Sequence, residues 1–167
     1  MSTATTVDTP AIASTPQLKS IRARGTWTGA LRTDVEVGSF SFTTGEPVAL
    51  GGDNSAPTPM DYVVGGFLGC LTVLIELVAR ERGIDIAVIR HTATAKLDRR
   101  GFAGLADVSP SFTSLEATVW VEATALTDEF AELIDQVEKR CPAYNLFHQA
   151  GCTPEVTWLL NGAEVSA

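Results

Sequence analysis

The chain has 167 residues, of which 45% are hydrophobic and 19% charged, so it can bury a core as one globular domain. Its net charge of −8 and its lack of a basic stripe argue against nucleic acid and anionic membranes as partners. The longest apolar run, residues 62–75, is shorter than the roughly 20 residues that cross a bilayer. With no secretory signal visible, we expect a cytoplasmic protein.

The N-terminal part predicts a tail followed by strands. Residues 1–17 are small, polar and interrupted by proline, which predicts a disordered tail before a domain over residues 18–167. Residues 18–29 and 30–42 carry β-branched and aromatic side chains with partial alternation. They predict an antiparallel meander with turns near Thr28-Gly29 and Gly38, followed by a loop over residues 44–57.

A long helix is predicted from about Thr58 to Arg82. Thr58 suits the N-cap, Pro59 the first helical position, and Asp61 the reciprocal position of a capping box. Gly83 is a typical residue just after a helix end. The helix is apolar on almost every side as far as residue 75, so we expect it to be buried on all sides. Its three internal glycines predict the close approach of another backbone; they are Gly65, Gly66 and Gly69.

The C-terminal half predicts two strands, two helices and a last strand. The strands cover residues 84–98 and 111–125, with a loop between them. Residues 126–140 form an amphipathic helix capped by Thr127, and residues 141–151 a short helix that starts at Cys141-Pro142. Residues 155–160 form a strand. The order βββ–α–ββ–αα–β predicts the α+β class.

Three cysteines, Cys70, Cys141 and Cys152, are too few and too scattered for a secreted disulfide framework. The two histidines, His91 and His148, lie far apart, so we expect no metal site. Composition alone makes Cys70 a buried core residue. Cys141 precedes a proline at a helix start, next to Lys139 and Arg140, which favours its thiolate; an ordinary capping role is the alternative.

Two cysteine-containing stretches carry a family resemblance. The stretch "LGGDNSAPTPMDYVVGGFLGCLTVLIELVARERGI" holds Cys70, and "VEKRCPAYNLF", about seventy residues on, holds Cys141. Together with "RGTWTGALRTDVEVGSFSF", they resemble the OsmC/Ohr family. The resemblance implies antiparallel sheets around a long central helix. It also implies an intertwined homodimer with its active sites at the subunit interface.

The resemblance also implies an activity. Well-studied members are thiol peroxidases that act on organic hydroperoxides in oxidative-stress defence. Carried onto this chain, Cys70 attacks the peroxide, Cys141 condenses with it to a disulfide, and an external dithiol restores both thiols. The family uses an arginine from the N-terminal strands to assist the first cysteine, which here is Arg32, with Arg24 and Arg22 as alternatives. No cofactor is implied.

One position departs from the family pattern. Active members have a glutamate directly after the helix-opening proline, where it holds the arginine; this chain has Met60. That departure keeps a second hypothesis open, a dimeric OsmC-like protein that binds ligands or senses redox state without peroxidase turnover. The aromatic side chains of Phe67, Tyr144 and Phe147 fit either an apolar peroxide pocket or the core.

Overall fold

The computed structural model describes residues 16–166, in two compact units that divide between Ala56 and Pro57. The predicted tail, residues 1–17, lies outside the described residues except for its last two. The N-terminal unit is the predicted antiparallel meander in the order β1–β2–β3, followed by a short 3₁₀ helix, η1. Its elements are β1 (Ala23–Gly29), β2 (Arg32–Val37), β3 (Phe40–Thr44) and η1 (Val48–Leu50).

The meander has one apolar face. Because side chains alternate along a strand, the register places Trp27, Val35, Val37 and Phe40 on the same face. Trp27 and Phe40 have exposed fractions of 76% and 79%. The face therefore presents large apolar side chains to solvent within the single chain.

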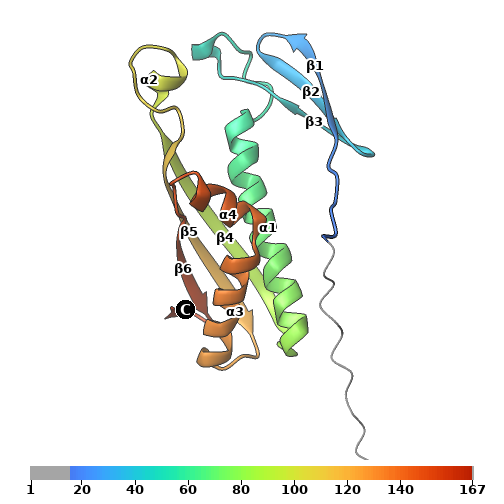
Figure 1. The fold of residues 1–167 in the computed structure, drawn as a ribbon, viewed down its shortest axis with the longest axis vertical. Helices are drawn as coiled ribbons and strands as arrows, with labels where there is room; N and C mark the ends of the chain where they lie inside the picture. The colour runs from blue at the N-terminus through green and yellow to red at the C-terminus, as the bar shows by residue number, and fades with distance from the viewer. Residues whose placement is uncertain (1–15, 167) are drawn as a thin grey trace, which may run out of the picture. The chain divides into compact units, whose positions relative to one another are not determined.

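The C-terminal unit packs helices on one face of a four-stranded sheet in the order β4–β5–β6–β7 (Figure 1). Alternate side chains of β5 point inward and are buried: Leu115, Ala117, Val119 and Val121. The elements are α1 (Pro59–Arg82), β4 (Ile86–Leu97), α2 (Arg99–Phe102), β5 (Phe112–Ala123), α3 (Thr127–Arg140), α4 (Pro142–Gln149), β6 (Glu155–Leu160) and β7 (Ala163–Val165).

The α+β class and the order of the long elements are confirmed, with four additions. The 3₁₀ helix η1, the one-turn helix α2 and the short strand β7 were not predicted. In addition, β6 pairs with β5 in parallel, while the other strand pairs of the sheet are antiparallel. A parallel neighbour needs a long crossover, and here α3 and α4 supply it. This crossover carries Cys141.

The predicted start of α1 is confirmed. The Thr58 hydroxyl accepts a hydrogen bond from the Asp61 N–H at 3.2 Å, and the Asp61 carboxylate accepts one from the Thr58 N–H at 2.8 Å. Gly83 ends the helix with φ of 69°. The predicted Thr127 cap of α3 is wrong. Leu126 is the N-cap there, and the Glu129 carboxylate accepts its N–H, so Thr127 is already helical.

The prediction that α1 is buried on all sides holds for only one face within the single chain. Its buried residues are Phe67, Leu71, Leu74, Ile75, Val78 and Ala79. Val73 and Leu77 are exposed, and a Cβ added at Gly65, Gly66 or Gly69 would meet no other atom of its unit within 4 Å. By length and hydropathy α1 would also pass as a membrane span, as many core helices do. Six buried residues make it a core helix here.

Candidate functional site: a pair of thiols between α1 and α4

The C-terminal unit brings two of the predicted site residues together. Cys70 lies on α1, and Cys141 lies at the corner between α3 and α4. Their sulfur atoms are 3.2 Å apart, and the Cys141 thiol donates to the Cys70 sulfur. Both are free thiols, Cys141 fully buried and Cys70 half-buried. A disulfide needs a sulfur separation of about 2.0 Å, so a shift of about 1.2 Å would join them.

Cys141 forms the corner because it belongs to both helices. Its N–H donates to the Val137 carbonyl and ends α3, and its side chain accepts from the Tyr144 N–H at 3.4 Å and begins α4. The predicted N-cap position is therefore confirmed. Pro142 follows at the first helical position, where a missing N–H costs nothing.

Of the two alternatives for Cys141, the structure supports the capping role and argues against the thiolate. Burial is the largest influence on the Cys141 thiol and raises its pKa; the Cys70 sulfur adds to this, the N–H groups of Tyr144 and Ala143 oppose it, and the net pKa is about 11. The partial positive charge at the N-terminus of the short helix α4 does not offset the cost of burying a thiolate. Cys141 is consequently a neutral thiol at neutral pH, which is the form that can donate to Cys70.

The two basic residues beside Cys141 are engaged elsewhere. Lys139 pairs with Asp135 at 2.9 Å, one turn back on α3. Arg140 makes two contacts with the Glu81 carboxylate of α1, at 2.6 and 2.8 Å. The Arg140 guanidinium holds the pKa of Glu81 below its usual range. Lys139 and Arg140 therefore form ion pairs with carboxylates and do not stabilise a thiolate at Cys141. This is a second reason why Cys141 is not a thiolate.

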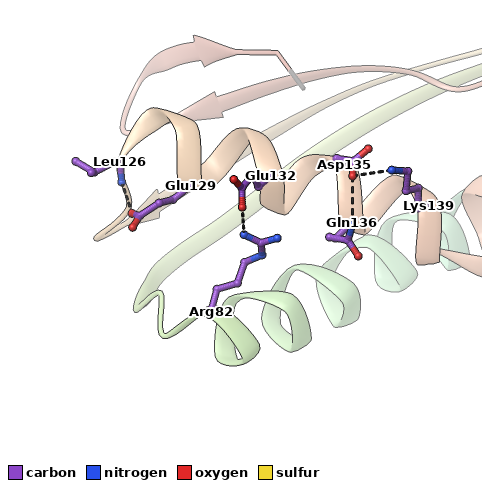
Figure 2. Close-up of polar contacts among 7 residues, drawn as sticks. All are labelled: Arg82, Leu126, Glu129, Glu132, Asp135, Gln136 and Lys139. Atoms are coloured by element: carbon purple, nitrogen blue, oxygen red, sulfur yellow. Dashed lines mark hydrogen bonds and ion pairs between the residues drawn. The ribbon is translucent and has the colours of Figure 1, made fainter. Parts of the chain in front are cut away.

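The packing of α3 against α1 sets the distance between the thiols. The four apolar residues that mark the predicted amphipathic face of α3 are buried in the core: Phe130, Leu133, Ile134 and Val137. Figure 2 shows Arg82 of α1 reaching Glu132 of α3, the second ion pair between these helices besides Arg140–Glu81. Apolar burial supplies most of the stability, since exposed ion pairs contribute little.

Arg32, the third predicted site residue, belongs to the N-terminal unit. It opens β2 directly after Ala30 and Leu31, which both have positive φ, at 49° and 57°. Such values are uncommon for residues other than glycine, asparagine and aspartate, so this turn is strained. The alternatives, Arg24 and Arg22, are exposed, Arg24 in β1 and Arg22 just before it.

Asp53 is the acidic partner of Arg32 in that unit. Its carboxylate lies 3.4 Å from Nη1 of Arg32, while its other oxygen accepts from the Ser55 hydroxyl at 2.6 Å and the Ser55 N–H at 3.1 Å. These Ser55 hydrogen bonds, and then Arg32, hold the pKa of Asp53 below its usual range. The Nε atom of Arg32 is buried and has no hydrogen-bond partner among the described residues.

The position of the family glutamate holds an exposed side chain. Met60 is the second residue of α1, with an exposed fraction of 42%. Phe67 and Phe147 are core residues, packed edge to face with ring centroids 5.7 Å apart. Tyr144 is half-buried, and burial and then the Glu138 carboxylate raise its pKa. Of the three aromatic candidates, two therefore serve the core.

Two residues that contact the predicted site residues were not identified from the sequence. The first is Asp53, and the signal for it was the Asp-x-Ser pattern of a local turn. The second is Asn145, whose side-chain amide reaches three backbone carbonyls at the corner next to Cys141. Only its position four residues after the cap hinted at this.

The two histidines each share a hydrogen bond with a threonine hydroxyl. His91 pairs with Thr72 at 2.8 Å, and His148 pairs with Thr153 at 2.9 Å.

The fold and this pair of thiols define a class: α+β proteins in which a cysteine of the long helix lies beside a cysteine at a helix corner. The family model described as "OsmC-like protein" matches residues 52–157, more than half of the chain. The chain belongs to the OsmC-like family. Within residues 16–166, no group of three or more His, Cys, Asp or Glu side chains is arranged to hold a metal ion.

Solved structures share the fold at low sequence identity. An OsmC-like protein from Mycoplasma pneumoniae is 18% identical with a TM-score of 0.73, over 85% of this chain and 97% of that one. An organic hydroperoxide resistance protein OsmC from Legionella pneumophila is 21% identical with a TM-score of 0.60, over 87% and 98%. The organic hydroperoxide resistance protein OhrB of Bacillus subtilis is 18% identical with a TM-score of 0.55, over 87% and 100%. Curated protein sequences gave no match.

The protonation of Cys141 can be measured in a variant with one thiol. In Cys70→Ser/Cys152→Ser, we expect the far-ultraviolet absorbance of the thiolate to appear with a midpoint well above the ordinary value of about 8.5, because burial remains. A cysteine-free variant corrects for tyrosine, and the same protein in denaturant should titrate near the ordinary value. A folded-state midpoint at or below that of the denatured protein would contradict the assignment.

Proposed function

We propose that this protein is a cytoplasmic thiol peroxidase that reduces organic hydroperoxides through a Cys70–Cys141 disulfide. The observation that carries the proposal is the 3.2 Å separation of two free thiols that lie 71 residues apart in the chain. Membership of the OsmC-like family supports it, as do structural relatives named for organic hydroperoxide resistance. No cofactor takes part.

The chemistry proceeds in three balanced steps. The Cys70 thiolate attacks the distal oxygen of the hydroperoxide; the O–O bond breaks, an alcohol leaves after taking up a proton, and Cys70 becomes a sulfenic acid. The sulfur of Cys141 then attacks the sulfenic sulfur; the S–O bond breaks, and the hydroxyl group leaves with the Cys141 proton as water, which gives the disulfide. An external dithiol reduces this disulfide by exchange and is itself oxidised to a disulfide.

Each cysteine suits its step. Cys70 is the more accessible of the pair, as a residue that meets substrate must be. Cys141 is buried, neutral and already aimed at the Cys70 sulfur, so it does not compete for peroxide. Cys141 belongs to the apolar core and Cys70 packs against it, and these apolar surroundings favour an organic hydroperoxide over hydrogen peroxide.

The decisive experiment measures consumption of cumene hydroperoxide in the presence of dithiothreitol. We expect turnover by the wild type, faster than with hydrogen peroxide, and none by Cys70→Ser. Peptide mapping after one equivalent of peroxide should find Cys70 linked to Cys141. Cys152→Ser is the matched control and should keep its activity, since Cys152 takes no part. A Cys141–Cys152 link, or a wild type that consumes no peroxide, would favour the non-catalytic binding or sensing alternative.

We also propose that the protein is a homodimer. Within the chain, α1 exposes Val73 and Leu77 beside three glycines, and the N-terminal meander exposes Trp27 and Phe40. Exposed apolar surface of this extent is typical of an interface. Light scattering at micromolar concentration should give twice the chain mass. Val73→Glu should lower this mass, because it places a charge on the exposed face of α1. A monomeric wild type would contradict the proposal.

Arg32 is proposed as the residue that favours the Cys70 thiolate, as its position in the family pattern implies. Arg32→Ala should slow the oxidation of Cys70 by about tenfold or more, because a cation near a cysteine raises its thiolate fraction. Met60→Glu, which introduces the glutamate of the family pattern, should make the oxidation of Cys70 faster. Stopped-flow oxidation rates decide, with Arg24→Ala as the control from the same sheet. Slowing in Arg24→Ala but not in Arg32→Ala would assign the role to Arg24.

A further inference from the structure

One side chain bridges three backbone carbonyls at the corner between α3 and α4. The Asn145 amide nitrogen lies 3.2 Å from the Glu138 carbonyl oxygen, 3.1 Å from that of Lys139 and 2.9 Å from that of Cys141. An asparagine amide has two hydrogens, so at least one of them is shared between carbonyls. Asn145 itself is half-buried on the first turn of α4.

The Glu138 and Lys139 carbonyls need a partner because of how α3 ends. The last carbonyls of a helix have no N–H partner within it, and a glycine-based turn or water usually satisfies them. Here Cys141 leaves the helical conformation with ψ of 114°, and Pro142 follows without an N–H to offer. The amide of Asn145 reaches back from α4 and takes over this role. It thereby fixes the angle at which α4 leaves α3.

The residue at the vertex of that angle is Cys141. Its N–H donates to Val137 at 2.9 Å, and its carbonyl accepts from the Asn145 backbone N–H at 3.0 Å as well as from the Asn145 amide. Its sulfur accepts from Tyr144. The backbone of Cys141 is thus held on both sides, and Asn145 supplies two of the hydrogen bonds that hold it.

We propose that Asn145 is a positioning residue for the second, disulfide-forming step of the peroxidase cycle, an inference that rests on the function proposed above. That step needs the Cys141 sulfur to approach Cys70 to about 2.0 Å with a dihedral angle near 90°. A misplacement of about 1 Å can cost on the order of 100-fold in rate. Asn145 reaches only backbone carbonyls at the corner, so its loss should leave the attack of Cys70 on peroxide unchanged.

The experiment separates the two steps in Asn145→Ala. Stopped-flow measurement gives the rate at which peroxide oxidises Cys70, and dimedone trapping gives the lifetime of the sulfenic acid. We expect an unchanged first step, within about twofold, and a disulfide-forming step slowed by about tenfold or more. Asn145→Asp, which keeps the shape but loses the amide donors, should behave in the same way and serves if the alanine variant does not fold.

Asn161 offers a matched control. Its side chain also bridges backbone groups, accepting from the Ala123 N–H at 3.1 Å and donating to the Ala123 carbonyl at 3.0 Å, at the end of β5. Asn161→Ala should leave both steps at wild-type rates. Wild-type disulfide formation in both Asn145 variants, or equal slowing of both steps, would overturn the proposal.

A second readout needs no peroxide and keeps the proposal separate from the proposed function. Equilibration in glutathione redox buffers measures how readily Cys70 and Cys141 join, whatever oxidises them. We expect the Asn145 variants to need a more oxidising buffer than the wild type to reach half-oxidation. If wild-type Cys70 does not react with peroxide but this shift is present, the peroxidase function fails and the positioning role stands. An unchanged midpoint would overturn the positioning role.

Discussion

The corner at Cys141 is the constraint on which the rest of the site depends. Two helices meet there at a residue that ends one and begins the other, and a proline prevents α3 from continuing. The corner comes to Cys70 because α3 buries one apolar face against α1 and the sheet, and because β6 returns alongside β5. A change in either contact would move the second thiol relative to the first.

Burial governs the electrostatics of the pair. Desolvation outweighs the N–H groups that point at Cys141, so the sulfur stays protonated and serves as a donor. The basic residues that precede it could have reversed this balance, but Glu81 and Asp135 engage them in ion pairs. Full burial of the sulfur, together with those two carboxylates, therefore decides the protonation state of the corner.

The sequence predicted the parts of this structure that depend on local patterns. Thr58, Pro59 and Asp61 fixed the start of α1, and the spacing of apolar residues identified α3, because capping and amphipathicity are properties of neighbouring residues. The meeting of Cys70 and Cys141 came only from the family resemblance, since 71 residues separate them. Asn145 and the parallel β5–β6 pair were missed because both depend on how the crossover folds back in space.

The two cysteines are unequally buried, and this decides which of them a reductant attacks in the proposed disulfide. In the proposed cycle, an incoming thiolate would attack Cys70, the partly exposed residue of the pair, and not Cys141, which is fully buried. Reduction therefore expels Cys141 as the leaving group. Thiols of high pKa leave slowly, and burial gives Cys141 a pKa of about 11. In that cycle, the burial that protects Cys141 from peroxide would also slow reduction of the disulfide, so the oxidised protein would be long-lived and its reduction would limit the rate of turnover.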